Sequence, residues 1–181
     1  MLRYRLADGA TRPQAYARFS SALSGPRERE VAVGLSARPL ASVPVRLAAE
    51  ARVSETTQGT EVRPEVFAVT ELPAVRLPLG FRGEAYAQVG YVGGAFATAF
   101  VDGQARIDRQ LLGAGDAELR AGAGTWGGAQ NDVSRLDVGP TAALDVRLGA
   151  TRARVAVDYR FRVAGDAAPA NGPALTLSAG F

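Results

Sequence analysis

The fold is decided by residues 135–163, which read RLDVGPTAALDVRLGATRARVAVDYRFRV. On either side of Gly149 and Ala150, most alternate residues are apolar, and those between them are mostly charged or small. Successive side chains of a strand point to opposite faces, so this period predicts two β-strands, each with one apolar and one ionic face. The two-residue link with Gly first suits a type II′ turn, which predicts that the strands form a hairpin.

This turn fixes the register of the predicted hairpin. Pairing Leu148 with Thr151 brings opposite charges together at two places, Asp145 with Arg154 and Asp137 with Arg162. The same register aligns apolar residues in three pairs, Val146 with Ala153, Leu144 with Val155 and Ala142 with Val157. A slip of one residue would move every Arg to the apolar face, so the register is strongly specified.

Weaker copies of this alternation recur along the chain. Eleven segments are predicted to be strands, roughly at residues 1–6, 14–22, 30–38, 45–53, 62–70, 82–92, 96–108, 117–127, 135–148, 151–163 and 172–181. Pro64, Pro73 and Pro78 interrupt the pattern around the fifth segment, where a continuous strand is least expected. No boundary of a second domain is visible, so residues 1–181 are expected to form a single domain.

The composition argues against catalysis. The chain has no Cys and no His, which removes disulfides, thiolate ligands, the usual general base and most zinc or haem ligation. We therefore expect no enzyme activity, no metal site and no cofactor. The 21 basic residues are all Arg, lie along the whole chain and are nearly balanced by 18 acidic residues. This spread favours a solvated charged face over a nucleic-acid-binding patch.

Three features favour a membrane barrel over a soluble sandwich or lipocalin-like barrel, whose strands also alternate. The clearest strands are about ten to fourteen residues long, which suits a tilted span of bilayer. Their polar faces carry several Arg and Asp, as a wet lumen does. The chain also ends on an alternating strand with an aromatic last residue, typical of the C-terminal assembly signal of such barrels. The sequence therefore predicts an all-β, antiparallel transmembrane β-barrel of about 10–12 strands in a Gram-negative outer membrane.

Loop lengths predict an orientation, because such barrels keep short turns in the periplasm and longer loops outside. Counting back from the C-terminus places residues 164–171, 128–134 and 54–61 outside and the turn at Gly149 inside. The odd strand count leaves the N-terminus at the outer end, whereas a closed barrel with both ends in the periplasm needs an even count. No secretory signal precedes the first strand. We therefore expect upstream strands, with this chain as the C-terminal part of a larger barrel.

The expected site residues form three groups. The polar residues expected to face the lumen are Arg135, Asp137, Asp145, Arg147, Arg152, Arg154, Asp158, Arg160 and Arg162. The aromatic residues expected at the outer rim or in a membrane girdle are Tyr91, Trp126, Tyr159 and Phe161. The residues expected to form the assembly signal are Leu175, Leu177 and Phe181. The polar group suits either a track for a sugar polymer or a network that stabilises the wall, and Trp126 suits either rim packing or stacking on a sugar.

Four strings in the last third of the chain are distinctive: GAGTWGGAQ at residues 122–130, RLDVGP at 135–140, DYRFRVAG at 158–165 and GPALTL at 172–177. Together they resemble the C-terminal domain of bacteriophage N4 adsorption protein A, most strongly over about residues 115–181. The segments 16–18 and 33–40 resemble the family's earlier strands more weakly. The resemblance implies a large outer-membrane protein with helical repeats ahead of its barrel, linked to exopolysaccharide secretion, used as a phage receptor and lacking catalytic residues.

We therefore expect a porin-like barrel that acts in exopolysaccharide export and presents its loops, residues 165–171 among them, to phage. The expected partners are outer-membrane lipid, the barrel-assembly machinery, an exopolysaccharide and a phage tail protein, and no nucleic acid. Two alternatives stay open: a structural or adhesive outer-membrane domain with a closed lumen, and a soluble β-sandwich binding module. The membrane assignment fails if Leu144, Val155 and Val157 lie in a dry interior with the arginines outermost.

Overall fold

The computed structural model describes residues 2–21, 29–56, 59–95, 97–149, 151–168 and 170–180. Within them the chain is all-β apart from a 3-10 turn, η1 (Pro78–Gly80). The strands are β1 (Leu2–Arg5), β2 (Gln14–Ser21), β3 (Arg29–Ala37), β4 (Val45–Thr56), β5 (Gly59–Thr70), β6 (Val75–Arg76), β7 (Phe81–Val92), β8 (Thr98–Ala114), β9 (Ala117–Gln130), β10 (Val133–Leu148), β11 (Thr151–Gly165) and β12 (Gly172–Gly180).

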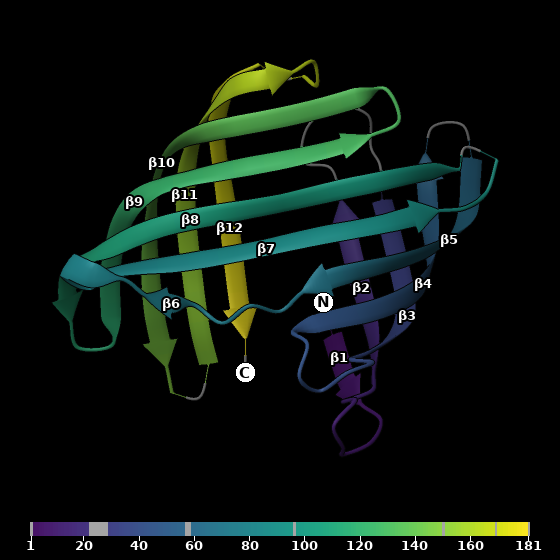
Figure 1. The fold of residues 1–181 in the computed structure, drawn as a ribbon, viewed down its shortest axis with the longest axis horizontal. Coiled ribbons are helices and arrows are strands. Elements are labelled where there is room, and N and C mark those ends of the chain that lie inside the picture. Colours follow the sequence, from purple (N-terminus) through teal and green to yellow (C-terminus); the bar gives the residue numbers. More distant parts are fainter. Residues whose placement is uncertain are drawn as a thin grey trace. The chain divides into compact units, whose positions relative to one another are not determined.

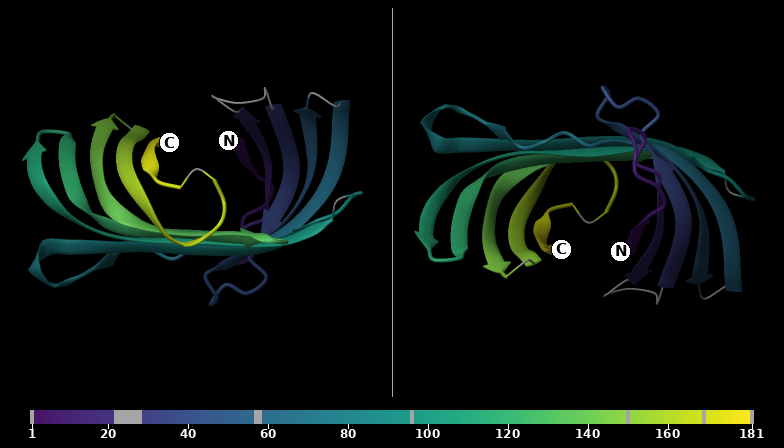
Figure 2. Two further views of the ribbon diagram at one scale, coloured as in Figure 1. Left: turned by 90° about the horizontal axis from the view of Figure 1, so that it is seen from above. Right: turned by 90° about the horizontal axis from the view of Figure 1, so that it is seen from below.

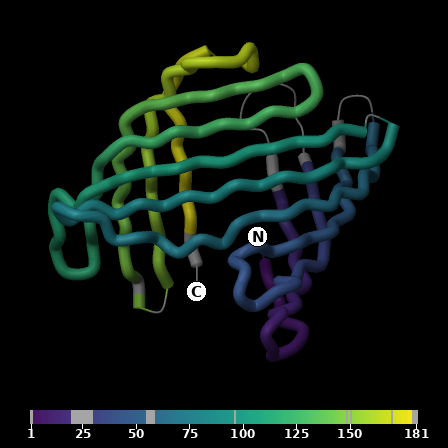
Figure 3. Tube along the Cα trace, viewed as in Figure 1, coloured from purple at the N-terminus to yellow at the C-terminus, as the bar shows by residue number. Residues whose placement is uncertain are grey.

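The strands are neighbours in the order in which they occur along the chain. The sheet runs β1-β2-β3-β4-β5-β7-β8-β9-β10-β11-β12, and the short β6 pairs with β7 beside this path (Figure 1). The Cα trace follows the same succession of antiparallel hairpins (Figure 3). Each of the eleven predicted segments contains a strand within the described residues, so the all-β antiparallel prediction is confirmed. The sheet is not closed on itself, so the finer prediction of a barrel is not observed.

The chain divides into two compact units. The first contains Met1–Glu71 and Ala87–Val101, and the second contains Leu72–Tyr86 and Asp102–Phe181. The long strands β7 and β8 contribute residues to both units. Each unit has its own polar and apolar sheet faces and is described by itself below.

The predicted register of the β10–β11 hairpin is confirmed. Leu148 pairs with Thr151, and the predicted partners follow from there, Asp145 with Arg154 and Leu144 with Val155. The predicted register holds from Leu148 back to Asp137, which lies opposite Arg162. It shifts by one residue between Asp137 and Leu136. Gly149 has the positive φ, 63°, expected at the first turn position. Ala150 lies outside the described residues, so the turn type itself is not assigned.

The prolines act differently from one another. β5 runs through Pro64, where the sequence pattern made a continuous strand least expected. The Pro64 carbonyl accepts a 2.8 Å hydrogen bond from the Gly93 amide, one residue beyond the Glu65–Val92 end of the paired ladder with β7. The proline therefore removes a donor only at the edge of that ladder, where its loss is tolerated. Pro73 and Pro78 do interrupt the sheet, because β6 between them is only two residues long.

Burial is inverted relative to a water-soluble sheet protein. On the apolar face of the second unit, Leu144, Val155 and Val157 are 41%, 40% and 51% exposed. On the opposite face, Asp137 and Asp158 are each 1% exposed. In the first unit Val33 and Leu35 are exposed in the same way, while charged residues on the opposite face of the sheet are buried. The covered side of each unit is therefore the polar one.

Candidate functional site

The polar face of the second unit is concave. Glu84 on β7 lies 3.2 Å from Arg154 on β11, although β8, β9 and β10 separate these strands in the sheet. Neighbouring strands are spaced about 4.8 Å apart, so in a flat sheet β7 and β11 would lie roughly 19 Å apart, too far for this ion pair. The sheet must therefore curve with its polar face inside, as the bent ribbons of β8–β11 show (Figures 1 and 2).

Asp108 on β8 is the centre of this polar face and is 2% exposed. Its carboxylate accepts a 2.5 Å hydrogen bond from Arg120 Nε on β9. The guanidinium groups of Arg82 and Arg154 lie 3.4 Å and 3.6 Å from the same carboxylate. Asp145 on β10 in turn lies 3.7 Å from both of these arginines. One carboxylate thus joins four strands, and side chains of β7 and β11, which are not neighbours in the sheet, both meet on it.

Most of the predicted lumen-facing residues do lie on this covered face. Asp145 and Arg154 belong to the Asp108 network, and Arg160 pairs with Asp158 at 3.3 Å. Asp158 also accepts a 2.6 Å hydrogen bond from the Thr141 hydroxyl. Asp137 faces Arg162 in the register but pairs instead with Arg135 on its own strand, at 2.5 Å. Arg162 donates to the Ala167 carbonyl at 2.6 Å.

Two of the predicted residues are exposed instead of covered. Arg147 and Arg152 lie directly opposite each other at the end of the β10–β11 hairpin, and both are exposed. Neither forms an ion pair with another part of the chain that the structure describes. Like charges in this position repel, so they need water or an external anion nearby.

The sequence analysis did not predict several members of the ion-pair network on the polar face of the second unit. Arg82 and Glu84 on β7, Arg106 and Asp108 on β8, and Arg120 on β9 all belong to it. Each occupies the polar position of an alternating strand, so the same period-two signal identifies them. The sequence of the β10–β11 hairpin alone does not indicate which other strands provide the ion-pair partners of its charged side chains.

The place of Trp126 at the outer rim or in a girdle stays a prediction, but Trp126 lies on the polar face of the second unit. It is 6% exposed, faces Asp137 across the β9–β10 pair and lies under the Arg160 guanidinium, 4.6 Å from the ring centroid. The reason is its parity, because the apolar positions of β9 are odd-numbered, Leu119 among them. Gly124 leaves space for the indole, since a Cβ there would lie 2.6 Å from it.

The other three predicted girdle residues lie on the apolar face. Tyr91 belongs to the first unit, whereas Tyr159 and Phe161 belong to the second, and all three are exposed. The Tyr159 and Phe161 rings are in contact, with centroids 4.8 Å apart. Leu175 and Leu177 on β12 are also exposed on this face, whereas Phe181 lies outside the described residues.

The polar face of the second unit contains buried groups whose hydrogen-bonding capacity the protein does not satisfy. Among the described residues, eight buried side-chain atoms lack a hydrogen-bond partner: Arg82 Nε, Asp102 Oδ1, Arg106 Nε, Trp126 Nε1, Asp137 Oδ1, Asp145 Oδ2, Arg154 Nε and Arg160 Nε. Protein interiors pair nearly all such atoms, because an unpaired one costs about 1–3 kcal/mol. A dry interior is therefore unfavourable here, and water or a polar ligand suits this face.

The polar face of the first unit has its own network across β2–β5. The Tyr16 hydroxyl and the Arg18 guanidinium donate to the two oxygens of Glu50, at 2.8 Å and 2.6 Å. Arg52 donates to Glu65 at 2.8 Å and also pairs with Glu30. None of these residues was predicted as part of a site, although each lies at a polar position of its strand.

Glu71 holds two arginines together just beyond the end of β5. It accepts hydrogen bonds from Arg38 Nε at 2.6 Å and from Arg46 Nε at 2.8 Å. Burial alone would raise the pKa of Glu71, but the hydrogen bonds and charges of Arg46 and Arg38 outweigh it and lower that pKa. The Glu71 carboxylate therefore ties the loop after β3 to the start of β4 and the end of β5.

No arrangement of three or more acidic side chains in the described part of the chain is suited to holding a metal ion. Within the same residues, no helix has the length and apolar character needed to cross a membrane. Comparisons with protein-family models, curated proteins and solved structures found no match to this chain.

Proposed function

We propose that this chain is a transmembrane β-barrel domain of a bacterial outer membrane that acts in exopolysaccharide export and serves as a phage-adsorption receptor. The observation that carries the proposal is the inverted burial of the two sheet faces. Val155, Val157 and Leu144 are exposed, whereas Asp137 and Asp158 on the opposite face are each 1% exposed.

The size of the apolar surface supports a lipid environment. Among the described residues, 33 large apolar side chains are exposed. Burying one fully is worth about 1.5–3 kcal/mol, so transferring these partly exposed groups into lipid would be favourable by tens of kcal/mol in total. Large exposed apolar surfaces usually mark sites of contact with a protein or a membrane.

The polar face supports an aqueous lumen. Its unpaired buried atoms, Trp126 Nε1 and Asp137 Oδ1 among them, need hydrogen bonds that water or sugar hydroxyls provide. The exposed Arg147 and Arg152 extend the polar surface at one end of the β10–β11 hairpin. The link to exopolysaccharide and phage rests on the resemblance of residues 115–181 to the adsorption-protein family.

The membrane part of the proposal is tested by fractionation and gel migration. The protein should be recovered in the outer-membrane fraction and migrate faster before heating than after, as folded barrels do. Recovery in the soluble fraction, with unchanged migration on heating, would favour the soluble β-sandwich module. The biological part is tested by deleting the gene in its host, which should reduce both polymer secretion and phage adsorption.

A specific observation favours a second candidate, a structural or adhesive domain with a closed lumen. The contact of Glu84 with Arg154, and the meeting of Arg82, Arg120 and Arg154 at Asp108, fill the concave face of the second unit with ion pairs. Conductance of the full-length protein in a planar bilayer separates the two candidates. Stable open channels support export, and an inserted protein without conductance supports the structural role.

A further inference from the structure

Arg109 is an exception on the apolar face of the sheet. It follows Ala105 and Ile107 at the outward positions of β8 and is exposed. Among strand residues with described side chains, it is the one charged residue on the apolar face, and it has no ion-pair partner within them. An Arg on a lipid-facing surface is costly in the middle of a bilayer and tolerated near headgroups, so its position needs an explanation.

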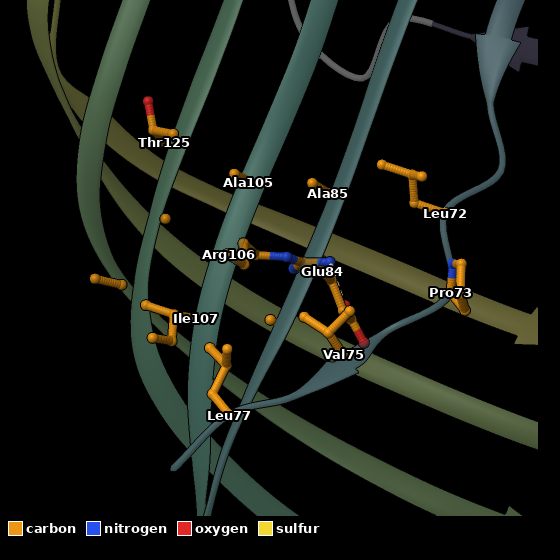
Figure 4. Close-up of a pocket in the computed structure, with 13 residues that line it drawn as sticks. Leu72, Pro73, Val75, Leu77, Glu84, Ala85, Ala105, Arg106, Ile107 and Thr125 are labelled. Atoms are coloured by element: carbon orange, nitrogen blue, oxygen red, sulfur yellow. Dashed lines mark ion pairs between the residues drawn. The ribbon is translucent and has the colours of Figure 1, made fainter. Parts of the chain in front are cut away.

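An apolar groove of about 530 Å³ lies on the same face of the second unit. One wall is the segment before β7, with Leu72, Val75 and Leu77, and the floor consists of small residues of β7–β9 (Figure 4). The floor residues include Gly83, Ala85, Ala105 and Ala123. Gly83 lets the wall approach, because a Cβ there would lie 3.1 Å from Val75 and 3.4 Å from Leu77.

Arg109 lies beside this groove. Ile107, two residues earlier on the same face of β8, lines it. The Arg109 Nε atom is 3.9 Å from where a Cβ of Gly80 would be, so the guanidinium lies against the turn that directly follows Leu77. A free cation and an apolar groove are thus contiguous on one surface.

We propose that the groove and Arg109 form a binding site for one phospholipid, with an acyl chain in the groove and the phosphate on the guanidinium. A planar guanidinium matches two phosphate oxygens, and the small residues leave room for a chain that Leu or Val would displace. The site deepens the proposed membrane function and rests on it.

The position of Arg109 along β8 argues for phospholipid rather than lipopolysaccharide. Arg109 lies nearer the Ala114 end of its strand, which leads into the short turn that contains Asp116. The Arg147 amide donates to the Asp116 carbonyl at 2.8 Å, so this turn lies at the same end as the turn at Gly149. Short turns lie on the periplasmic side of such barrels, and the leaflet there consists of phospholipid.

A second groove provides a contrast within the same chain. It has a volume of about 730 Å³ on the apolar face of the first unit and is lined by Leu35, Leu47, Val66 and Tyr91. The residues that line it include no charged side chain, whereas Glu84 and Arg106 are among those that line the first groove. The proposal therefore depends on Arg109 beside a groove, because a groove by itself is an ordinary space between exposed side chains.

The test is native mass spectrometry of the full chain, refolded in detergent with dioleoylphosphatidylglycerol as the lipid. The wild type should retain one lipid molecule, and Arg109→Gln should reduce the retained fraction about tenfold because it removes the charge-assisted pair. Arg12→Gln, which removes an exposed Arg from a loop of the first unit, should retain the lipid. Ala123→Leu should fill the groove and lose the lipid, whereas Ala142→Leu adds the same volume elsewhere on the apolar face and should not.

Heat-modifiable migration of each variant verifies that it is folded before its lipid content is compared. Equal lipid retention by the folded wild type, Arg109→Gln and Ala123→Leu would overturn the site and leave the membrane proposal intact. Failure of the wild type to insert into dioleoylphosphatidylcholine vesicles would instead overturn the membrane proposal. Preferential retention of lipopolysaccharide in competition would refute the choice of phospholipid.

Discussion

Replacing Asp108 with Asn tests whether the concave polar face of the second unit stabilises the fold. The carboxylate is 2% exposed and accepts a 2.5 Å hydrogen bond from Arg120, with Arg82 and Arg154 within 3.6 Å. The amide keeps the shape of the side chain but removes the charge that offsets three guanidinium groups. Removing one partner of a buried pair costs about 3–5 kcal/mol, because the other charge is left uncompensated.

The structure places the expected loss in the lower half of that range. Only Arg120 is nearly fully covered, whereas Arg82 and Arg154 are partly solvated and keep Glu84 and Asp145 as alternative partners. We therefore expect the free energy of unfolding to fall by about 3 kcal/mol. Adding Arg120→Leu to Asp108→Asn should recover part of the loss, because it removes the uncompensated charge.

The assay is urea unfolding of the refolded protein in detergent, followed by tryptophan fluorescence. Trp126 is the only Trp in the chain and lies on the same polar face, so its emission reports on the unit concerned. The matched control is Asp132→Asn in the exposed turn after β9, expected to change stability by less than about 0.5 kcal/mol. An Asp108→Asn protein as stable as this control would refute the reasoning, since water alone would then compensate the arginines.

Three further predictions concern other parts of the chain. Because the folded pKa of Glu71 is lowered, its contribution to stability is fully present above the ordinary Glu pKa, about 4.3, and is lost as the pH falls through the folded value. Glu71→Gln should therefore lower stability at pH 7 and flatten the acid side of the stability profile measured by urea unfolding. Val157→Arg, on the apolar face of β11, should cost about 2–4 kcal/mol in vesicles if that face meets the middle of the bilayer, and an unchanged unfolding curve would contradict the lipid contact. Gly139→Ala should reduce the folded fraction on unheated gels, because its Cβ would lie 1.8 Å from the Tyr159 carbonyl oxygen. Gly172→Ala, with nothing within 4 Å, is its control, and equal folded fractions would refute the steric argument.

Local structure is where sequence reasoning was most accurate. The alternation of residues 135–163 predicted β10, β11 and their register down to the pairs Asp145 with Arg154 and Leu144 with Val155. Alternation is a property of the strand itself, and a short turn leaves few ways to pair the two strands that it joins. The same signal located the other strands except the two-residue β6, and among them β5, whose Pro64 the ladder with β7 tolerates at its end.

Contacts between strands distant in the sheet could not be predicted in this way. Glu84 on β7 meets Arg154 on β11 across three intervening strands, and Arg82 on β7 meets Asp145 on β10 across two. These contacts depend on how strongly the sheet curves, which is a sum of small bends and twists over many strands. The face on which Trp126 lies is different, because its even position on β9 is readable from the sequence.

Alternation in the sequence by itself determined that this chain has two-faced strands, joined in order and paired in a defined register. It did not determine which face is covered, because a period of two is the same whether the apolar side turns inward or outward. Tertiary structure decided that point through the curvature of the sheet, which brings arginines and aspartates from non-adjacent strands together and leaves the valines and leucines exposed. The groove beside Arg109 also depends on the tertiary structure, since its wall and floor come from separate segments of the chain.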